Sequence, residues 1–193
     1  GMSGLAAPMT YIELGDDVLA GNAGLTNIEN NQLHVADGTN MTVMYPEYNF
    51  TNTEILAAGG MRVGYTIISN DGSATDLDRY CGFGVGNTLN ECQTANFDYN
   101  GVGFRGRVNN YVGTSDIWIG WSPVGGGTIQ LFKNGPTSEG GENYDIATGV
   151  ALTGNDRLEM ELTITSFDAG STVAVDILWN SAVIHSTTFQ WDN

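Results

Sequence analysis

Basic residues are scarce in this 193-residue sequence, which holds 6 Lys and Arg against 22 Asp and Glu for a formal net charge of −16. Lys133 is the single lysine. Proteins that grip nucleic acid need clustered Lys and Arg to displace phosphate counterions, and attraction to anionic lipids needs the same clusters. The composition therefore argues against nucleic acid and anionic membranes as partners, and it leaves neutral ligands and cations open.

Long apolar runs are also missing, because no stretch reaches the 18 or so apolar residues of a membrane-spanning segment, and we expect no membrane insertion. Residues 1–8 have neither the basic start nor the apolar run of a signal peptide, so we interpret them as a cloning remnant or flexible leader. Residues 9–193 are predicted to form a single β-sandwich domain, since sandwiches of roughly 200 residues commonly fold as one unit.

Cysteine is limited to Cys81 and Cys92, and His34 and His185 lie too far away in sequence to complete a zinc motif. We favour a short-range disulfide between the two cysteines, which loop-closure entropy would make worth about 3 kcal/mol. Two reduced cysteines on neighbouring strands are the alternative. A disulfide predicts an oxidising compartment, and hence an extracellular or cell-surface location.

Good helix formers are few, whereas Asn, Asp, Gly, Ser and Thr interrupt the chain roughly every 8 to 12 residues, a spacing typical of all-β domains. One short helix is expected over 53–58. The expected strands are 32–35, 41–45, 61–68, 80–86, 93–99, 103–109, 117–121, 129–133, 157–167, 172–180 and 182–191.

Side-chain alternation in the segment 157–165 predicts which strand faces are buried. Its apolar residues Leu158, Met160, Leu162 and Ile164 point one way, whereas the acidic and threonine residues between them point the other way. Strands with one apolar and one polar face are typical of two antiparallel sheets that share a core. The fold class predicted from the residues is therefore all-β, a two-sheet antiparallel sandwich.

Four segments, 61–68, 81–86, 157–165 and 186–193, together resemble the concanavalin A-like lectin and glucanase superfamily. They are similar in particular to the laminin-G-like jelly-roll domains of secreted bacterial proteins. The resemblance spans about residues 28–193 and consists of a pattern of strands and glycines. It implies a concanavalin A-like jelly roll of two curved sheets that binds glycans on one sheet or on rim loops, often with a structural calcium. Members include lectins, carbohydrate-binding modules, glucanases, lyases and adhesin domains.

Glu159 and Glu161 are the weak candidates for a catalytic pair, because alternate residues on one strand face lie about 7 Å apart. Laminarinase-type glucanases of this superfamily carry Glu-x-Asp-x-x-Glu on one strand. The present chain departs from that signature, with Glu161 at the central position and Ile164 at the last. We therefore interpret both glutamates as a solvated strand face, with Arg105 and Arg107 as possible cross-strand partners, and assign no catalytic residue.

A calcium site is predicted in the loop 70–78, where Asp71, Asp76 and Asp78 gather the oxygen ligands that hard cations prefer. Asp16 and Asp17 are a weaker candidate. The loop lacks the closing Glu of an EF-hand, and an ordinary polar turn is the alternative interpretation.

The predicted ligand face combines Arg105, Arg107, Trp118 and Gln130, which fall on the polar faces of successive expected strands. Alternation in the segment 116–121 sets Trp118 outward and Trp121 toward the core. An exposed indole can stack on the apolar face of a sugar ring, while Arg and Gln bond its hydroxyl groups.

The leading functional expectation is a non-catalytic, lectin-like carbohydrate-binding domain of a secreted or surface protein, with a polysaccharide or glycan as partner. We expect it to be part of a larger multidomain protein. The first alternative is a glycoside hydrolase or polysaccharide lyase of the same fold. The second is a structural or adhesive domain without glycan specificity, and fold alone does not choose among the three.

Overall fold

A computed structural model describes residues 18–21, 26–29, 32–35, 42–44, 51–70, 81–86, 116–133 and 142–191. The chain divides into two compact units, Gly1–Asn49 and Phe50–Asn193. Among the described residues, no helix is both long and apolar enough to cross a bilayer. A single domain over residues 9–193 stays a prediction.

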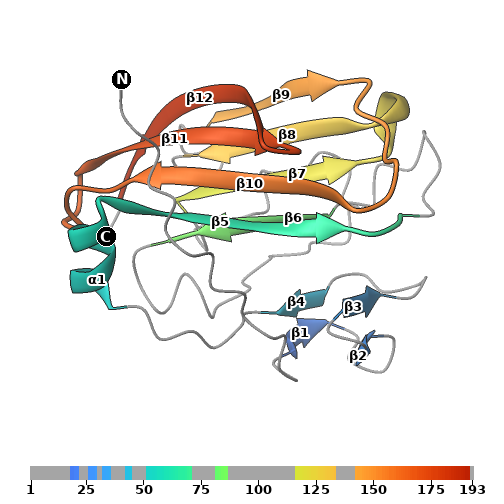
Figure 1. The fold of residues 1–193 in the computed structure, drawn as a ribbon, viewed down its shortest axis with the longest axis horizontal. Helices are drawn as coiled ribbons and strands as arrows, with labels where there is room; N and C mark the ends of the chain where they lie inside the picture. Colours follow the sequence, from blue (N-terminus) through green and yellow to red (C-terminus); the bar gives the residue numbers. More distant parts are fainter. Residues whose placement is uncertain are drawn as a thin grey trace. The chain divides into compact units, whose positions relative to one another are not determined.

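The first unit contains two antiparallel strand pairs (Figure 1). Strand β1 (Val18–Gly21) pairs with β4 (Thr42–Met44), and β2 (Thr26–Glu29) pairs with β3 (Gln32–Val35). The strands expected at 32–35 and 41–45 are confirmed, the second one slightly shorter than expected. Strands β1 and β2 were not predicted from the sequence.

The second unit consists mainly of two four-stranded antiparallel sheets that lie as stacked layers (Figure 1). The C-terminal sheet has the order β12-β11-β10-β5, formed by Ala182–Gln190, Thr172–Trp179, Asp156–Thr163 and Gly60–Ile67. The middle sheet has the order β6-β7-β8-β9, formed by Cys81–Val85, Ile117–Ser122, Thr128–Lys133 and Glu142–Thr148. The predicted all-β class, with two antiparallel sheets, is confirmed.

Helical structure is confined to two short elements among the described residues. Helix α1 (Asn52–Ala58) confirms the expected helix, and Thr51 and Glu54 begin it with a reciprocal capping box. Gly59 ends it in the left-handed conformation at φ 79°. A 3-10 turn, η3 (Val124–Gly126), follows β7.

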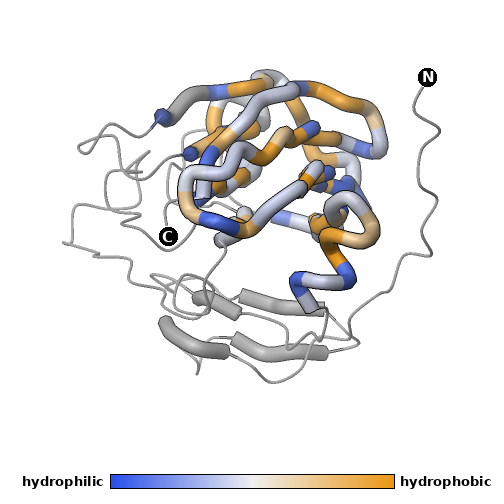
Figure 2. Tube along the Cα trace, turned by 90° about the vertical axis from the view of Figure 1, so that its left-hand side faces the viewer, coloured by the Kyte–Doolittle hydropathy of each residue, from blue (hydrophilic) through white to orange (hydrophobic). Residues whose placement is uncertain are grey.

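One hydrophobic core joins the inner faces of the two sheets, and hydrophobic residues recur along the strands of both layers (Figure 2). The predicted inward residues Leu158, Met160, Leu162 and Ile164 are confirmed, because all four side chains are buried. The middle sheet contributes Ile117, Ile119, Trp121, Ile129 and Leu131. Trp121 is therefore a core residue, as alternation predicted, and its indole N–H donates to the carbonyl of Val150 at 2.7 Å.

Each long side of the sandwich is closed by a contact between the sheets. On the side of β9 and β12, the Lys133 ammonium of β8 donates to Thr187 Oγ1 at 2.8 Å and to the Thr188 carbonyl at 2.9 Å. On the side of β5 and β6, the rings of Tyr65 and Phe83 meet edge to face with centroids 5.3 Å apart. The single lysine is thus buried between the sheets and links them.

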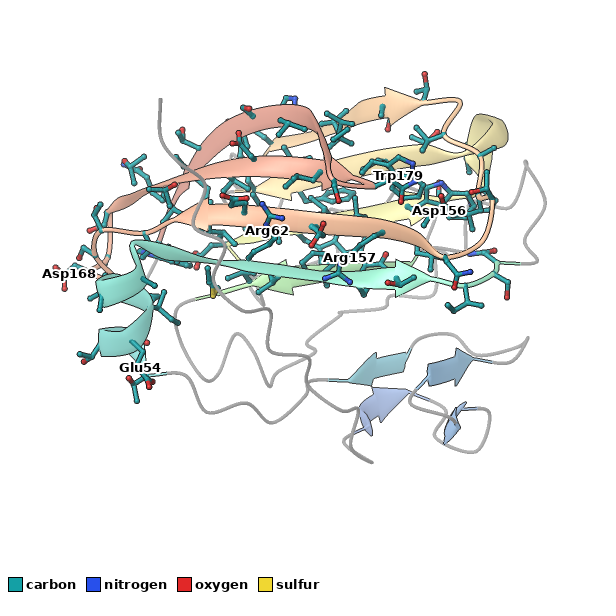
Figure 3. The ribbon with its side chains drawn as sticks, in the orientation of Figure 1. Glu54, Arg62, Asp156, Arg157, Asp168 and Trp179 are labelled. Carbon is teal, nitrogen blue, oxygen red and sulfur yellow. The ribbon has the colours of Figure 1, made fainter. Side chains whose placement is uncertain are left out.

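A buried carboxylate organises one end of the sandwich, where Asp156 and Trp179 lie close together in Figure 3. Asp156 accepts hydrogen bonds from the Thr153 and Gly154 amides at 2.6 and 3.1 Å, and from Asn180 Nδ2 at 2.9 Å. Burial by itself raises the pKa of Asp156, but the hydrogen bonds from Asn180, Thr153 and Gly154 outweigh it and hold the pKa below its ordinary value. The ionised carboxylate therefore ties the loop before β10 to the hairpin between β11 and β12.

Candidate functional site

The outer face of the middle sheet carries the two predicted ligand residues that the structure describes. Trp118 of β7 and Gln130 of β8 alternate with the buried residues Ile117, Ile119, Ile129 and Leu131, so both side chains leave the sheet on the side away from the core. Both are half-buried. Arg105 and Arg107, the other two predicted ligand residues, lie outside the described residues.

Strand register places Gly82, Gly120, Gln130 and Asp145 in one row across the four strands of this sheet. Trp118 belongs to the neighbouring row, but its indole leans over the two glycines. A Cβ atom built on Gly82 would lie 2.0 Å from Trp118 Cζ2, and one built on Gly120 would lie 2.1 Å from Trp118 Cη2. The glycines thus leave the space that the ring occupies against the backbone.

Phe132 of β8 contacts the Trp118 ring, and Asp145 of β9 accepts a hydrogen bond from Gln130. The Phe132 ring meets the Trp118 ring with centroids 5.0 Å apart and planes at 64°. Gln130 Nε2 donates to Asp145 Oδ1 at 2.7 Å, and the Asp145 side chain is exposed. Gln130 Oε1 is buried, and no described residue donates to it. We call Gly82, Trp118, Gly120, Gln130 and Asp145 the indole platform.

The indole platform presents an aromatic ring, an amide and a carboxylate in sequence across the sheet. Neighbouring strands are about 4.8 Å apart. The aromatic ring, the amide and the carboxylate are therefore spaced at intervals that suit a linear ligand built from successive ring units. The half-buried ring offers part of an apolar surface and the exposed Asp145 carboxylate offers an acceptor, whereas Phe132 and Gln130 Oε1 on the same face are buried. This combination is suited to a ligand with one apolar face and several hydroxyl or amino substituents.

Sequence analysis did not identify Asp145, because β9 was not among the expected strands. Its segment contains Glu142, Asn143 and Asp145, which are uncommon in strands. Tyr144 and Ile146 at alternate positions were the available signal. The structure adds a register shift between β8 and β9 next to Gln130, which alternation alone does not reveal.

Glu159 and Glu161 lie on the outer face of the other sheet, on β10. Glu161 is exposed and forms an ion pair with Arg62 of β5, as expected of a solvated strand face. Glu159 is only 2% exposed, so its interpretation as solvated was wrong. It lies opposite Gly64 and the buried Leu178, both on flanking strands. Because one neighbour is a glycine and the other is a buried leucine, the Glu159 side chain can lie flat against the sheet.

Each of these two glutamates faces its own arginine, and Figure 3 shows Arg62 and Arg157 on the same outer face. Arg157 Nε lies 2.9 Å from Glu159 Oε1, but the geometry is not that of a hydrogen bond and both atoms are buried. The pairing partners are thus Arg62 and Arg157, while Arg105 and Arg107 lie outside the described residues. The two carboxylates do not face each other across a cleft.

The predicted calcium ligands Asp71, Asp76 and Asp78, and the weaker candidates Asp16 and Asp17, lie outside the described residues. Within the described ranges, no group of three or more His, Cys, Asp or Glu side chains is arranged to hold a metal ion. Cys81 begins β6 opposite Trp121. Its side chain and Cys92 lie outside the described part of the chain, so the disulfide stays a prediction.

Comparisons with known proteins identify no relative, since no family model, no curated protein and no solved structure matches the chain.

Proposed function

We propose that this chain is a non-catalytic carbohydrate-binding domain of the concanavalin A-like jelly-roll type, and that the glycan docks on the indole platform. One observation carries the proposal. The Trp118 ring lies over Gly82 and Gly120, and the row of these two glycines continues with the hydrogen-bonded Gln130 and Asp145.

The proposed binding energy has two sources. The apolar C–H face of a sugar ring stacks on the indole, which offers a large rigid surface with few rotatable bonds. Hydroxyl groups of the sugar donate hydrogen bonds to the exposed Asp145 carboxylate, which the Gln130 amide holds in position. Phe132 fixes the ring and Asp145 fixes the amide before the ligand arrives, which lowers the entropy lost on binding.

The position of the glutamates supports a binding role over hydrolysis. Glu159 and Glu161 are on the outer face of the C-terminal sheet, whereas the indole platform is on the outer face of the middle sheet, with the core between them. A glycan held on the platform would therefore be out of reach of both carboxylates. A retaining glycosidase needs its two carboxylates about 5 Å apart on either side of the bound sugar.

In this proposal the remaining predicted features support the sandwich and take no part in binding. A disulfide between Cys81 and Cys92 would restrain the start of β6 and would suit an extracellular or cell-surface protein. Calcium at Asp71, Asp76 and Asp78 would stabilise the loop after β5. The domain would serve as the glycan-binding part of a larger protein.

A glycan array combined with a reducing-sugar assay tests the proposal. We expect the unmodified protein to bind at least one glycan without turnover, and Trp118→Ala to weaken that binding about tenfold, which corresponds to about 1.4 kcal/mol. Gln130→Leu keeps the side-chain size and should weaken binding without disturbing the ring. A chain that binds no glycan, or binds equally well in both variants, contradicts the proposal. Turnover that is lost in Glu161→Gln but kept in Gln130→Leu would instead favour the hydrolase.

A further inference from the structure

The polar half of the indole platform is rich in hydrogen-bond acceptors. Asp145 carries a carboxylate, which only accepts when ionised, and Gln130 Nε2 occupies one of its two oxygens. Gln130 Oε1 is a further acceptor, but it is buried, so the exposed Asp145 carboxylate is the acceptor that a ligand can reach. A ligand that bonds this carboxylate must present donors, such as hydroxyl or ammonium groups. Carboxylates and sulfates would place acceptor against acceptor.

The charges around the platform also favour a ligand that carries donors over an anionic one. On the described part of the middle sheet the one cation is Lys133, and it is directed toward β12 between the sheets. Arg62 and Arg157 lie on the other sheet, each beside a glutamate. With a net charge of −16, the protein repels polyanions at long range and attracts cations.

We propose, on the basis of the proposed glycan-binding function, that the platform selects amino sugars with free amino groups, and that Asp145 binds the ammonium of a unit next to the one stacked on Trp118. A hydrogen bond between an ammonium and a carboxylate is roughly twice as strong as one between neutral groups. Acetylation of the amine removes this charge, so the acetylated sugar keeps the stacking interaction and loses the ion pair. A uronate unit reverses the charge and is excluded.

Calorimetric titration with three probes tests this selectivity: a glucosamine tetramer, an N-acetylglucosamine tetramer and a galacturonate tetramer. The titrations are run at about pH 6, where an amine of pKa near 8 is protonated. We expect the glucosamine tetramer to bind about tenfold more tightly than the acetylated one, and the galacturonate tetramer not to bind. Asp145→Asn should bring the ratio between the first two probes close to one.

Asp176→Asn is the matched control. Asp176 is also an exposed strand aspartate that accepts one side-chain hydrogen bond, from Ser186, but it lies on the C-terminal sheet. This substitution changes the net charge of the molecule by the same amount as Asp145→Asn. It should leave the ratio of the affinities for the glucosamine and N-acetylglucosamine tetramers unchanged. If both aspartate variants lower the ratio equally, net charge causes the preference and the proposed role of Asp145 is wrong.

The remaining outcomes separate this inference from the function on which it rests. Equal affinity for glucosamine and N-acetylglucosamine, with binding still dependent on Trp118, would overturn the selectivity and leave the glycan-binding function standing. Tight binding of galacturonate would also overturn it. A protein that binds none of these probes and no glycan on the array would overturn both.

Discussion

At the scale of single residues, the position of the Trp118 indole depends on glycines from two strands. Alternation predicts that Trp118 leaves the sheet on its outer face, and the structure agrees. Alternation does not predict that the ring leans onto Gly82, because that contact depends on which residue of β6 pairs with β7. Sequence therefore indicates the direction of this side chain, whereas strand register determines its neighbours.

Gly82→Ala tests whether the glycine holds the ring in place. The new methyl group would lie 2.0 Å from Trp118 Cζ2, so the indole must move away. We expect the free energy of unfolding to fall by about 1–3 kcal/mol, as for other overpacked sites, and glycan affinity to fall with it. Urea denaturation measures the first effect. Ala174→Ser, at an exposed position of β11, should change stability by less than about 0.5 kcal/mol. Unchanged stability in Gly82→Ala would contradict this account of the platform.

Asp156 makes stability depend on acid pH. Its pKa is below the ordinary value in the folded protein, because hydrogen bonds from Asn180, Thr153 and Gly154 outweigh burial. The folded state therefore gains stability from this group above the ordinary pKa of about 3.9, and loses it as the pH falls through the lower folded value. We expect the free energy of unfolding, measured with urea from neutral to acid pH, to fall more steeply below about pH 4 in the unmodified protein than in Asp156→Asn. Parallel curves would show that the carboxylate contributes nothing.

At the scale of elements, the segments with regular alternation were predicted closely. The expected strands 172–180 and 182–191 correspond to β11 and β12, and the expected 61–68 to β5. Strand β9 was missed because its polar residues mask the alternation. The expected strands 93–99 and 103–109 lie outside the described residues. Alternation along the sequence thus identifies a strand that has one apolar face. It does not identify a strand such as β9, whose residues are mostly polar.

Lys133 shows how one polar residue can connect two elements of different sheets. Lys133→Met keeps most of the side-chain volume but removes the donors to Thr187 Oγ1 and the Thr188 carbonyl. We expect a loss of about 1–3 kcal/mol in the free energy of unfolding, since hydrogen bonds to a charged group are stronger than average.

Thr187→Val is the companion variant, because it removes one acceptor and keeps the lysine bonded to the Thr188 carbonyl. Its loss of stability should be smaller than that of Lys133→Met. A Lys133→Met protein as stable as the unmodified one would show that the link between β8 and β12 is energetically neutral, as replacement of some buried charges by apolar groups has proved to be.

At the scale of the whole molecule, the two sheets have different outer faces. The C-terminal sheet carries the ion pairs of Arg62 and Arg157 with their glutamates, whereas the middle sheet carries the indole platform. The all-β class followed from turn spacing and alternation, which act locally. Which glycines lie beneath the aromatic ring did not follow, because that depends on the pairing of strands that are distant in sequence, such as β6 and β7.

Nuclear magnetic resonance titration with a glycan from the array tests the central claim most directly, because it locates the bound ligand without altering the protein. The account predicts that chemical shifts change at Gly82, Gly120, Gln130 and at the indole N–H of Trp118, and stay constant at Arg62, Glu161 and Asp176 on the opposite sheet. Changes confined to the C-terminal sheet around Glu159 and Glu161 would contradict it.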